Sequence, residues 1–193
     1  LALLMITHNL IFLPLMLILP LYLLFLIWKS NDKKTSILHT QYAILLGFSL
    51  SAFFWIPALA EKKYTIVDDL LLVNLADYRI HFVALTQLWN WPWGFGGSAA
   101  GLADGISFKI GKLHIILSGL AFILGLIHLF KNKFQSKLST VNCQLSTVIF
   151  ALFLLSAFMT TSYSSFVWQM IPPLAYLQFP WRFLTLTALF SSI

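Results

Sequence analysis

The sequence carries little charge. Only 9% of its 193 residues are Asp, Glu, Lys or Arg, whereas 60% are hydrophobic and the mean hydropathy is +0.88. Soluble domains carry about 25% charged residues, so this low proportion excludes a surface that mainly faces water. The composition therefore predicts a chain surrounded largely by lipid, whose Trp and Phe side chains anchor it at the membrane interfaces.

Cysteine and clustered metal ligands are also scarce. Cys143 is the single cysteine, which excludes an intrachain disulfide and leaves the redox compartment unreadable. The histidines are scattered, and none has a metal-ligand spacing, so no metal site is predicted. They are His8, His39, His81, His114 and His128. The net charge of +6 does not indicate nucleic-acid binding, because the basic residues lie at the ends of apolar runs.

Long apolar runs are abundant, and their lengths predict membrane spans. Crossing the hydrocarbon core takes about 20 residues of helix. The runs cover residues 10–28, 42–60, 113–130, 145–161 and, in part, 179–193, and the first could reach back to Leu1. We therefore predict an all-α polytopic membrane protein, a helix bundle forming a single membrane domain and a fragment of a larger chain. Local kinks are expected at Pro14, Pro20 and Pro57.

The connections between these runs predict an orientation. Residues 29–36 and 131–137 are short and rich in Lys, and 139–142 is expected to continue the second of these connections. The positive-inside rule places such loops in the cytoplasm. Residues 61–112 then form a long, structured loop on the outer face of a cell membrane, together with 161–178. Asp68 and Asp69 mark a helix start in this loop, and its helices are expected to lie in the interface.

Within the long loop, "WNWPWGFGGSAAGLADG" cannot form a spanning helix, because Pro92 and the glycines interrupt it. One interpretation is an aromatic belt with turns that seals the outer end of the bundle. The other is a cavity for a lipid-linked or sugar-like ligand. The candidate lining residues are Trp89, Trp91, Trp93, Gly96 and Gly97.

Four elements together resemble a known family. They are "THN" (7–9), "LSAFFWIPALAEKKYT" (50–65), "HFVALTQLWNWPWGFGGSAAGLADGISFKIGKLH" (81–114) and "LQFPWRFL" (177–184). The chain resembles the 6-pyruvoyl-tetrahydropterin synthase-related membrane domain family, and is similar to bacterial membrane glycosyltransferases of the C-type fold. Pyruvoyl-tetrahydropterin synthase chemistry itself is not predicted, because it would need three His zinc ligands in a soluble α+β fold.

The resemblance implies a function at the outer face. Such glycosyltransferases take a sugar from a polyprenyl-phosphate donor, and their catalytic acid lies in a first outer loop, which we expect to precede Leu1. This chain would then supply scaffold and part of the lipid-donor cavity. The alternative is a non-catalytic membrane protein, either a transporter or an assembly subunit, although no internal repeat or mid-span charge is seen.

Cationic residues are the candidates for binding a lipid phosphate. Arg182, beside Trp181, would grip phosphate through parallel hydrogen bonds, with Lys62 or Lys109 assisting. The alternative for Arg182 is an interfacial anchor that reaches the headgroups. Lys109 could equally be an ordinary headgroup anchor.

Catalytic candidates are weaker. Glu61 could act as a base or a metal ligand, but an acid followed by two lysines is more typical of a solvated helix end. Asp104 could bind a sugar hydroxyl or a divalent cation, although Asp-Gly is itself a turn signal. His81 could form a base with Asp77 on one helical face, although surface pairing is the simpler interpretation.

Overall fold

The structure is a computed structural model that describes the backbone of residues 1–71, 73, 76–131 and 137–193, and their side chains outside 128–143. The described residues form α-helices and 3₁₀-helices and no strand. One isolated parallel bridge joins Val83 and Thr161. The all-helical class predicted from the sequence is therefore confirmed.

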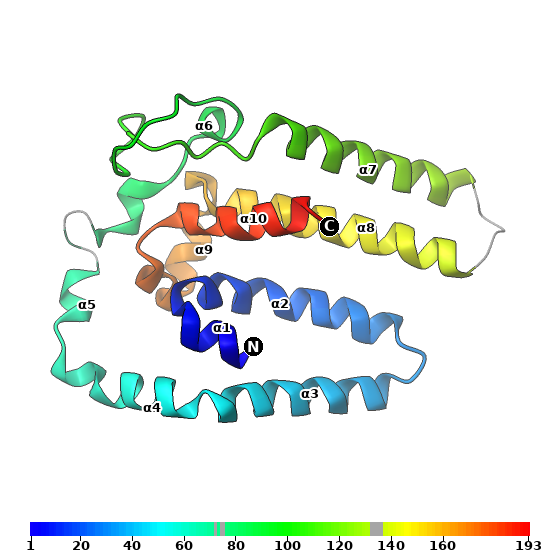
Figure 1. Ribbon diagram of the computed structural model, residues 1–193, viewed down its shortest axis with the longest axis horizontal. Coiled ribbons are helices and arrows are strands. Elements are labelled where there is room, and N and C mark those ends of the chain that lie inside the picture. The colour runs from blue at the N-terminus through cyan, green and yellow to red at the C-terminus, as the bar shows by residue number, and fades with distance from the viewer. Residues whose placement is uncertain (72, 74–75, 132–136) are drawn as a thin grey trace.

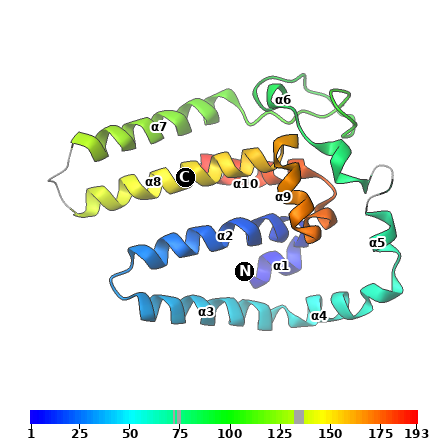
Figure 2. The ribbon, with the colours of Figure 1, turned by 180° about the vertical axis from the view of Figure 1, so that it is seen from behind.

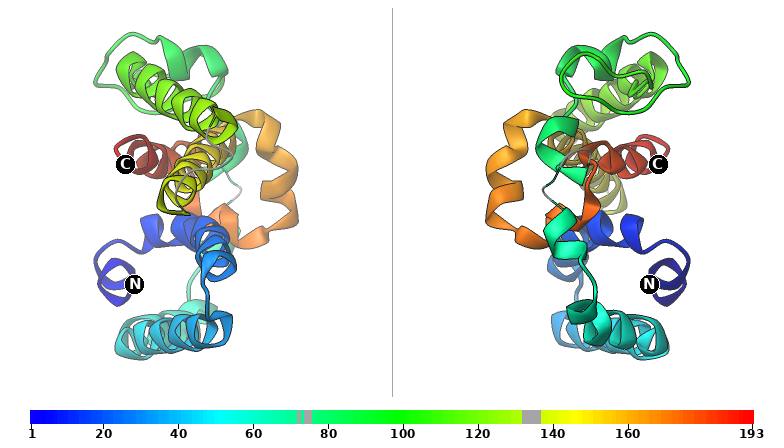
Figure 3. Two further views of the ribbon diagram at one scale, coloured as in Figure 1. Left: turned by 90° about the vertical axis from the view of Figure 1, so that its right-hand side faces the viewer. Right: turned by 90° about the vertical axis from the view of Figure 1, so that its left-hand side faces the viewer.

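The longer helices lie along the long axis of the molecule, and they alternate in direction from one to the next except that α4 continues in the direction of α3 (Figure 1). They are α2 (Asn9–Lys29), α3 (Lys33–Leu50), α4 (Ala52–Glu61), α7 (Lys112–Lys131), α8 (Lys137–Met159) and the shorter α10 (Leu184–Ser191). Helix α8 packs between α7 and α10, and α2 contacts both α8 and α10. End-on views place α7 at one edge of the bundle and α3–α4 at the other (Figure 3).

The two ends of the bundle differ. One end holds the α2–α3 connection and the facing termini of α7 and α8, and is here called the basic end (Figures 1 and 2). The opposite end, here called the loop end, holds the short elements. These are η1 (Lys62–Tyr64), α5 (Val67–Leu70), η3 (Tyr78–His81), α6 (Leu85–Trp89), η4 (Ser162–Ser164), α9 (Ser165–Met170), η5 (Pro172–Leu177) and η6 (Pro180–Phe183). The Lys-rich connections therefore share one end, as their sequences predict.

Some helices do not begin where the predicted apolar runs begin. Two of them begin several residues earlier, and the last one begins later. Asp32 caps α3 by accepting from the backbone N–H of Thr35 at 3.1 Å, so Lys33 onward is helical and the predicted connection 29–36 is too long. The backbone of 137–142 is also helical, so 139–142 is not loop. The last predicted run, 179–193, becomes α-helical only at Leu184, because Pro180 starts a 3₁₀ turn.

The predicted run 42–60 is broken by a 66° bend between α3 and α4. The bend lies at Ser51 and not at Pro57, and α2 continues through both of its prolines. Ser51 is fully buried, and its hydroxyl donates to the Gly47 carbonyl at 2.8 Å. The indole N–H of Trp55 donates to the carbonyl of Phe48 at 2.9 Å. These side-chain bonds satisfy carbonyls near the break.

The first run does not extend back to Leu1. The helix breaks at His8, whose backbone is not helical, and the preceding short helix α1 (Ala2–Thr7) contacts both α2 and α3. Gly47 is the contact point, since a Cβ there would lie 2.9 Å from Leu1 Cδ2. Helix α1 therefore packs where α3 approaches its bend (Figure 1).

The main hydrophobic core joins the bundle to the loop end. It contains buried side chains from α2, η3, α8, α9, η5, η6 and α10, with Trp168 and Phe183 among the largest. Trp168 stacks on Tyr78 with ring centroids 5.0 Å apart, and lies edge-on to Phe183. The short loop-end helices are thus held by aromatic packing and not by their own length.

One helix among the described residues, α2, is long and apolar enough to cross a membrane, and the bent α3–α4 pair would be a second. The described parts of α7 and α8, Lys112–Ile127 and Gln144–Met159, are apolar but shorter. This finding is a limited indication of membrane association through α2. It does not extend to the multi-pass arrangement predicted from the sequence.

Candidate functional site

Residues 90–111, here called the Trp/Gly loop, fold back on themselves beside α6. Gly96 N–H donates to the Gly105 carbonyl at 2.9 Å, and Gly105 N–H donates to the Gly97 carbonyl at 3.0 Å. A Cβ on Gly96 would lie 2.8 Å from Gly105 Cα, so the two backbones meet where no side chain fits. A Cβ on Gly97 would meet nothing within 4 Å. Gly96 therefore closes the loop, whereas Gly97 faces open space.

Asp104 ties this loop to α6. Its carboxylate accepts from the side-chain amide of Gln87 and from the backbone N–H of Ala99, each at 2.8 Å. Gln87 is fully buried and in turn accepts from Ala84 N–H at 2.7 Å. Both carboxylate oxygens of Asp104 are therefore engaged in holding the turn. In the part of the chain that the structure describes, no group of three His, Cys, Asp or Glu residues could hold a metal ion.

His81 is buried at the base of the Trp/Gly loop. Its Nδ1 is hydrogen-bonded to Ser98 Oγ at 2.8 Å, and its ring lies edge-on to Phe179 with centroids 4.7 Å apart. The hypothesis that Asp77 and His81 share an α-helical face is wrong, because residues 78–81 form a 3₁₀ turn. Asp77 instead pairs with Arg79 at 2.7 Å, and the hydrogen bond from Arg79 lowers the pKa of Asp77.

Arg182 lies in η6 and also contacts Phe179. Its guanidinium donates to the Leu177 carbonyl and sits 5.0 Å from the centre of the Phe179 ring. Partial burial lowers the pKa of this guanidinium. Ion pairs among the described residues join Lys62 to Asp68 and Arg79 to Asp77, so no carboxylate balances Arg182. The predicted candidates His81 and Arg182 are thus brought together around one aromatic ring.

An aromatic stack supports these residues. Trp181 stacks on Phe179 at 5.3 Å and on Phe108 at 5.8 Å, which links η6 to the Trp/Gly loop. The buried indole nitrogen of Trp181 and the buried hydroxyl of Ser107 have no hydrogen-bond partner in the described structure. Unpaired buried donors are costly, so both atoms are open to a further acceptor.

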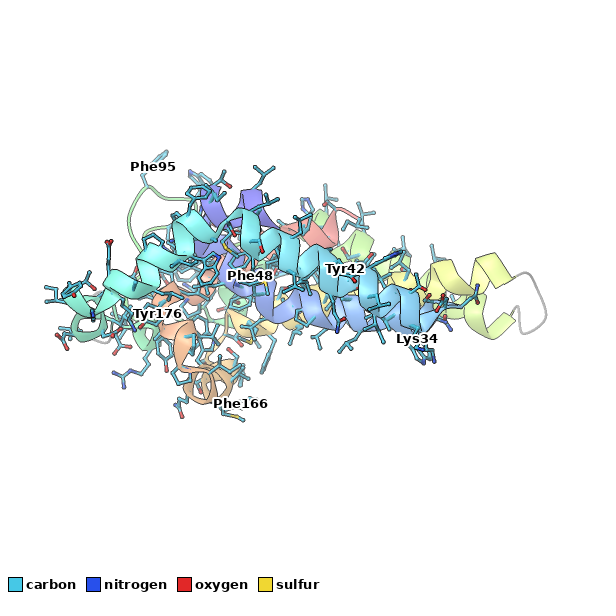
Figure 4. The ribbon with its side chains drawn as sticks, turned by 90° about the horizontal axis from the view of Figure 1, so that it is seen from below. Lys34, Tyr42, Phe48, Phe95, Phe166 and Tyr176 are labelled. Carbon is cyan, nitrogen blue, oxygen red and sulfur yellow. The ribbon has the colours of Figure 1, made fainter. Side chains whose placement is uncertain are left out.

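The three predicted tryptophans have different roles. Trp91 donates from its indole N–H to the Asp104 carbonyl at 3.3 Å, and so belongs to the fold of the loop. Trp89 lies under the Lys112 ammonium, 5.6 Å from the ring centre. Trp93 is 75% exposed, and the neighbouring Phe95 projects freely from the loop (Figure 4). The three indoles therefore have separate contacts in the part of the chain that the structure describes.

The remaining candidate residues are not among those that contact Phe179. Glu61 and Lys109 are exposed at the end of α4 and in the Trp/Gly loop, respectively. Lys62 forms an ion pair with Asp68 at 2.9 Å and lies 4.8 Å from the centre of the Tyr176 ring. Its ammonium is already neutralised, so the expectation that Lys62 assists Arg182 at a phosphate finds no support in these contacts.

Sequence reasoning missed a cavity of about 490 Å³ at the loop end. It lies between the segment that follows α4 and the segment α9–η5, and its lining includes Lys62, Asp68, Tyr78, Trp168, Pro172 and Tyr176. The Tyr176 hydroxyl donates to the Asp68 carboxylate. The acidic pair at the start of α5 was the available signal in the sequence. The neighbouring residues, however, do not indicate that Asp68 bonds to Tyr176, which lies 108 positions later.

Comparisons with known proteins leave the family open. No protein-family model matches the chain, and no curated protein matches it. No solved structure matches it either. The resemblance to membrane glycosyltransferases therefore stays a prediction based on the sequence elements alone.

Proposed function

We propose that the chain is a multi-pass membrane unit whose α2, α3–α4, α7 and α8 cross the bilayer, with α10 as a partial span. Large apolar side chains exposed along α3–α4 and α7 support this proposal, since soluble proteins rarely expose continuous apolar faces. Examples are Leu45, Leu46, Phe53, Leu59, Leu113, Leu117 and Leu124. Helix α7 has 20 residues, which corresponds to about 30 Å of rise.

Aromatic–lysine pairs support the placement of the two interfaces. Lys29 lies 4.6 Å from the Trp28 ring centre at the basic end, and Lys112 lies over Trp89 at the loop end. Trp and Lys are both enriched where helices leave the hydrocarbon core. The lysines of the basic end favour the cytoplasm for that end, so the loop end with residues 61–112 faces outward.

We infer that the loop end handles a polyprenyl-phosphate-linked sugar, as part of a glycosyltransferase-like protein. The observation that carries this inference is Arg182, a partly buried guanidinium with no acidic partner in the described structure. A phosphate would supply the missing charge and accept two parallel hydrogen bonds.

Binding of radiolabelled polyprenyl-phosphate sugar to the protein in lipid nanodiscs tests this function. Arg182→Ala is expected to weaken binding tenfold or more, because a charge-assisted hydrogen bond contributes about 1.5–3 kcal/mol. Arg182→Lys keeps the charge but not the two-bond geometry, and is expected to fall in between. Lys63→Ala removes an exposed cation at the same end and is the matched control.

A non-catalytic membrane protein, such as a transporter, is the second candidate. The break between α3 and α4 favours it, since transporters use discontinuous helices at their binding sites. The same assay separates the two. Wild-type protein that inserts but does not bind the labelled lipid, or an Arg182→Ala variant that binds it unchanged, would contradict the glycosyltransferase-like function.

A further inference from the structure

The cavity beside Lys62 carries a second inference. It lies at the loop end, where Figure 4 shows Tyr176, and it is far from Lys34 at the basic end. Residues from two parts of the chain that are distant in sequence line it. Lys62, Asp68, Leu71 and Tyr78 come from the first half, and residues between Trp168 and Tyr176 come from the second. A volume of about 490 Å³ falls within the range of small-molecule sites.

Its polar groups form one cluster without net charge. Hydrogen bonds from Tyr176 and Lys62 lower the pKa of Asp68, and hydrogen bonds to Tyr176 and Asp68 raise the pKa of Lys62. Both groups are therefore charged at neutral pH, and the charges cancel across 2.9 Å. The cluster has no excess positive charge to select a phosphate and no excess negative charge to select a cation.

The cluster nevertheless keeps unused hydrogen-bonding capacity. An ammonium has three donors and a carboxylate has about four acceptor sites, while Asp68 accepts here from Lys62 and Tyr176. The Lys62 and Asp68 side chains are 35% and 59% exposed, so a ligand can reach them. The donors of Lys62 and the acceptors of Asp68 lie side by side. This arrangement suits a ligand with adjacent hydroxyl groups, because each hydroxyl both donates and accepts a hydrogen bond.

Apart from the neutral amide of Gln169, the rest of the lining is mainly apolar. Pro172, Pro173, Ala175 and Leu71 form this part, together with the buried rings of Tyr78 and Trp168. An apolar wall opposite a few convergent polar groups fits a ring that has a C–H face and a hydroxylated edge. We propose that this cavity binds a neutral, hydroxyl-bearing ring of monosaccharide size, with its hydroxyls on Asp68 and Lys62 and its C–H face on the prolines.

This inference deepens the proposed function, and rests on it for the source of the ring as the sugar of a lipid-linked substrate. The two sites differ in chemistry. Arg182 has unbalanced positive charge, whereas the cavity is neutral. A probe with hydroxyls but no phosphate or lipid therefore tests the cavity separately from Arg182.

The experiment uses the full chain in nanodiscs, prepared without glycoside detergents. Saturation-transfer NMR measures binding of the methyl glycosides of glucose, galactose, mannose and N-acetylglucosamine, with inorganic phosphate as competitor. At least one glycoside is expected to bind saturably to the wild-type chain, and phosphate is expected not to displace it. The Arg182→Ala chain is expected to keep this binding, even where it loses the labelled lipid.

Variants localise the site. Asp68→Asn and Tyr176→Phe are each expected to weaken glycoside binding about tenfold, by removing an acceptor or a donor from the cluster. Asp69→Asn changes the same charge at an exposed position outside the cavity lining, and is expected to leave binding within twofold. Absence of saturable binding for all four glycosides, displacement by phosphate, or an equal effect of Asp69→Asn would overturn the proposal.

Discussion

Individual atoms decide how the Trp/Gly loop closes. Glycines 96 and 97 are adjacent and identical in the sequence, and both were predicted to line a pocket. The structure separates them, because a Cβ added at Gly96 would meet the Gly105 backbone, whereas a Cβ added at Gly97 would meet nothing within 4 Å. Pattern reading could identify a turn-rich segment here, but it could not tell which glycine makes the close contact.

Alanine substitution is expected to separate the two glycines. Gly96→Ala places a Cβ 2.8 Å from Gly105 Cα, and a contact with backbone cannot relax by side-chain rotation. We expect a loss of about 1–3 kcal/mol of local stability, the usual cost of overpacking. Hydrogen exchange of the Ala99 and Gly105 amides measures it. Gly97→Ala is the matched control, and equal exchange in the two variants would contradict the contact.

Two residues that were selected from the sequence for separate roles lie close together in the structure. Arg182 and His81 were both selected from the sequence, and they meet around Phe179. In the structure His81 is hydrogen-bonded to Ser98, and the carboxylate of Asp77 forms an ion pair with Arg79. A helical spacing of four residues predicts a pair only where the backbone is α-helical, and residues 78–81 are not.

At the scale of elements, the lengths of the apolar runs predicted where helices form. They did not predict where a helix is broken by a bend. Helix α7 covers the predicted run 113–130 almost residue for residue. The run 42–60 instead contains a bend, and the proline that suggested a kink lies six residues beyond it. The bend depends on Ser51 and Trp55 bonding to carbonyls of α3, and such bonds have no signature in an apolar sequence.

Removing one of these bonds is expected to loosen the bend. Trp55→Phe leaves the Phe48 carbonyl without its indole donor, at a cost of about 1–3 kcal/mol if it stays unsatisfied. Spin labels at the exposed positions Leu38 and Leu59, in a Cys143→Ser background, report the bend as a distance distribution. We expect a broader distribution in Trp55→Phe and none of this broadening in Trp28→Phe. Identical distributions would show that the indole bond does not hold the bend.

At the scale of the whole molecule, the distribution of lysines predicted which connections lie together. The α2–α3 connection and the facing ends of α7 and α8 share the basic end, and residues 61–112 occupy the opposite end (Figure 1). Counting the lysines in each connection predicts which connections share an end of the bundle. This prediction needs only the order of the segments along the chain and not the contacts between them. The cavity between Asp68 and Tyr176 depends on contacts, so it could not be predicted in this way.

The orientation is open to a direct test. Single cysteines replace Asn31 at the basic end and Gly97 at the loop end, again in a Cys143→Ser background. An impermeant maleimide is expected to label position 97 in intact cells and position 31 only after permeabilisation, because lysine-rich loops stay in the cytoplasm. Labelling of both positions from one side would contradict the bundle as a membrane-crossing unit.

The hydrogen bond between Tyr176 and Asp68 spans 108 positions of the chain. A ribosome releases the N-terminal wall of the cavity first, and α7 and α8 are made before η5. The cavity is therefore completed only after α7 and α8 have been made. Whatever ring it holds can enter only once these two helices exist.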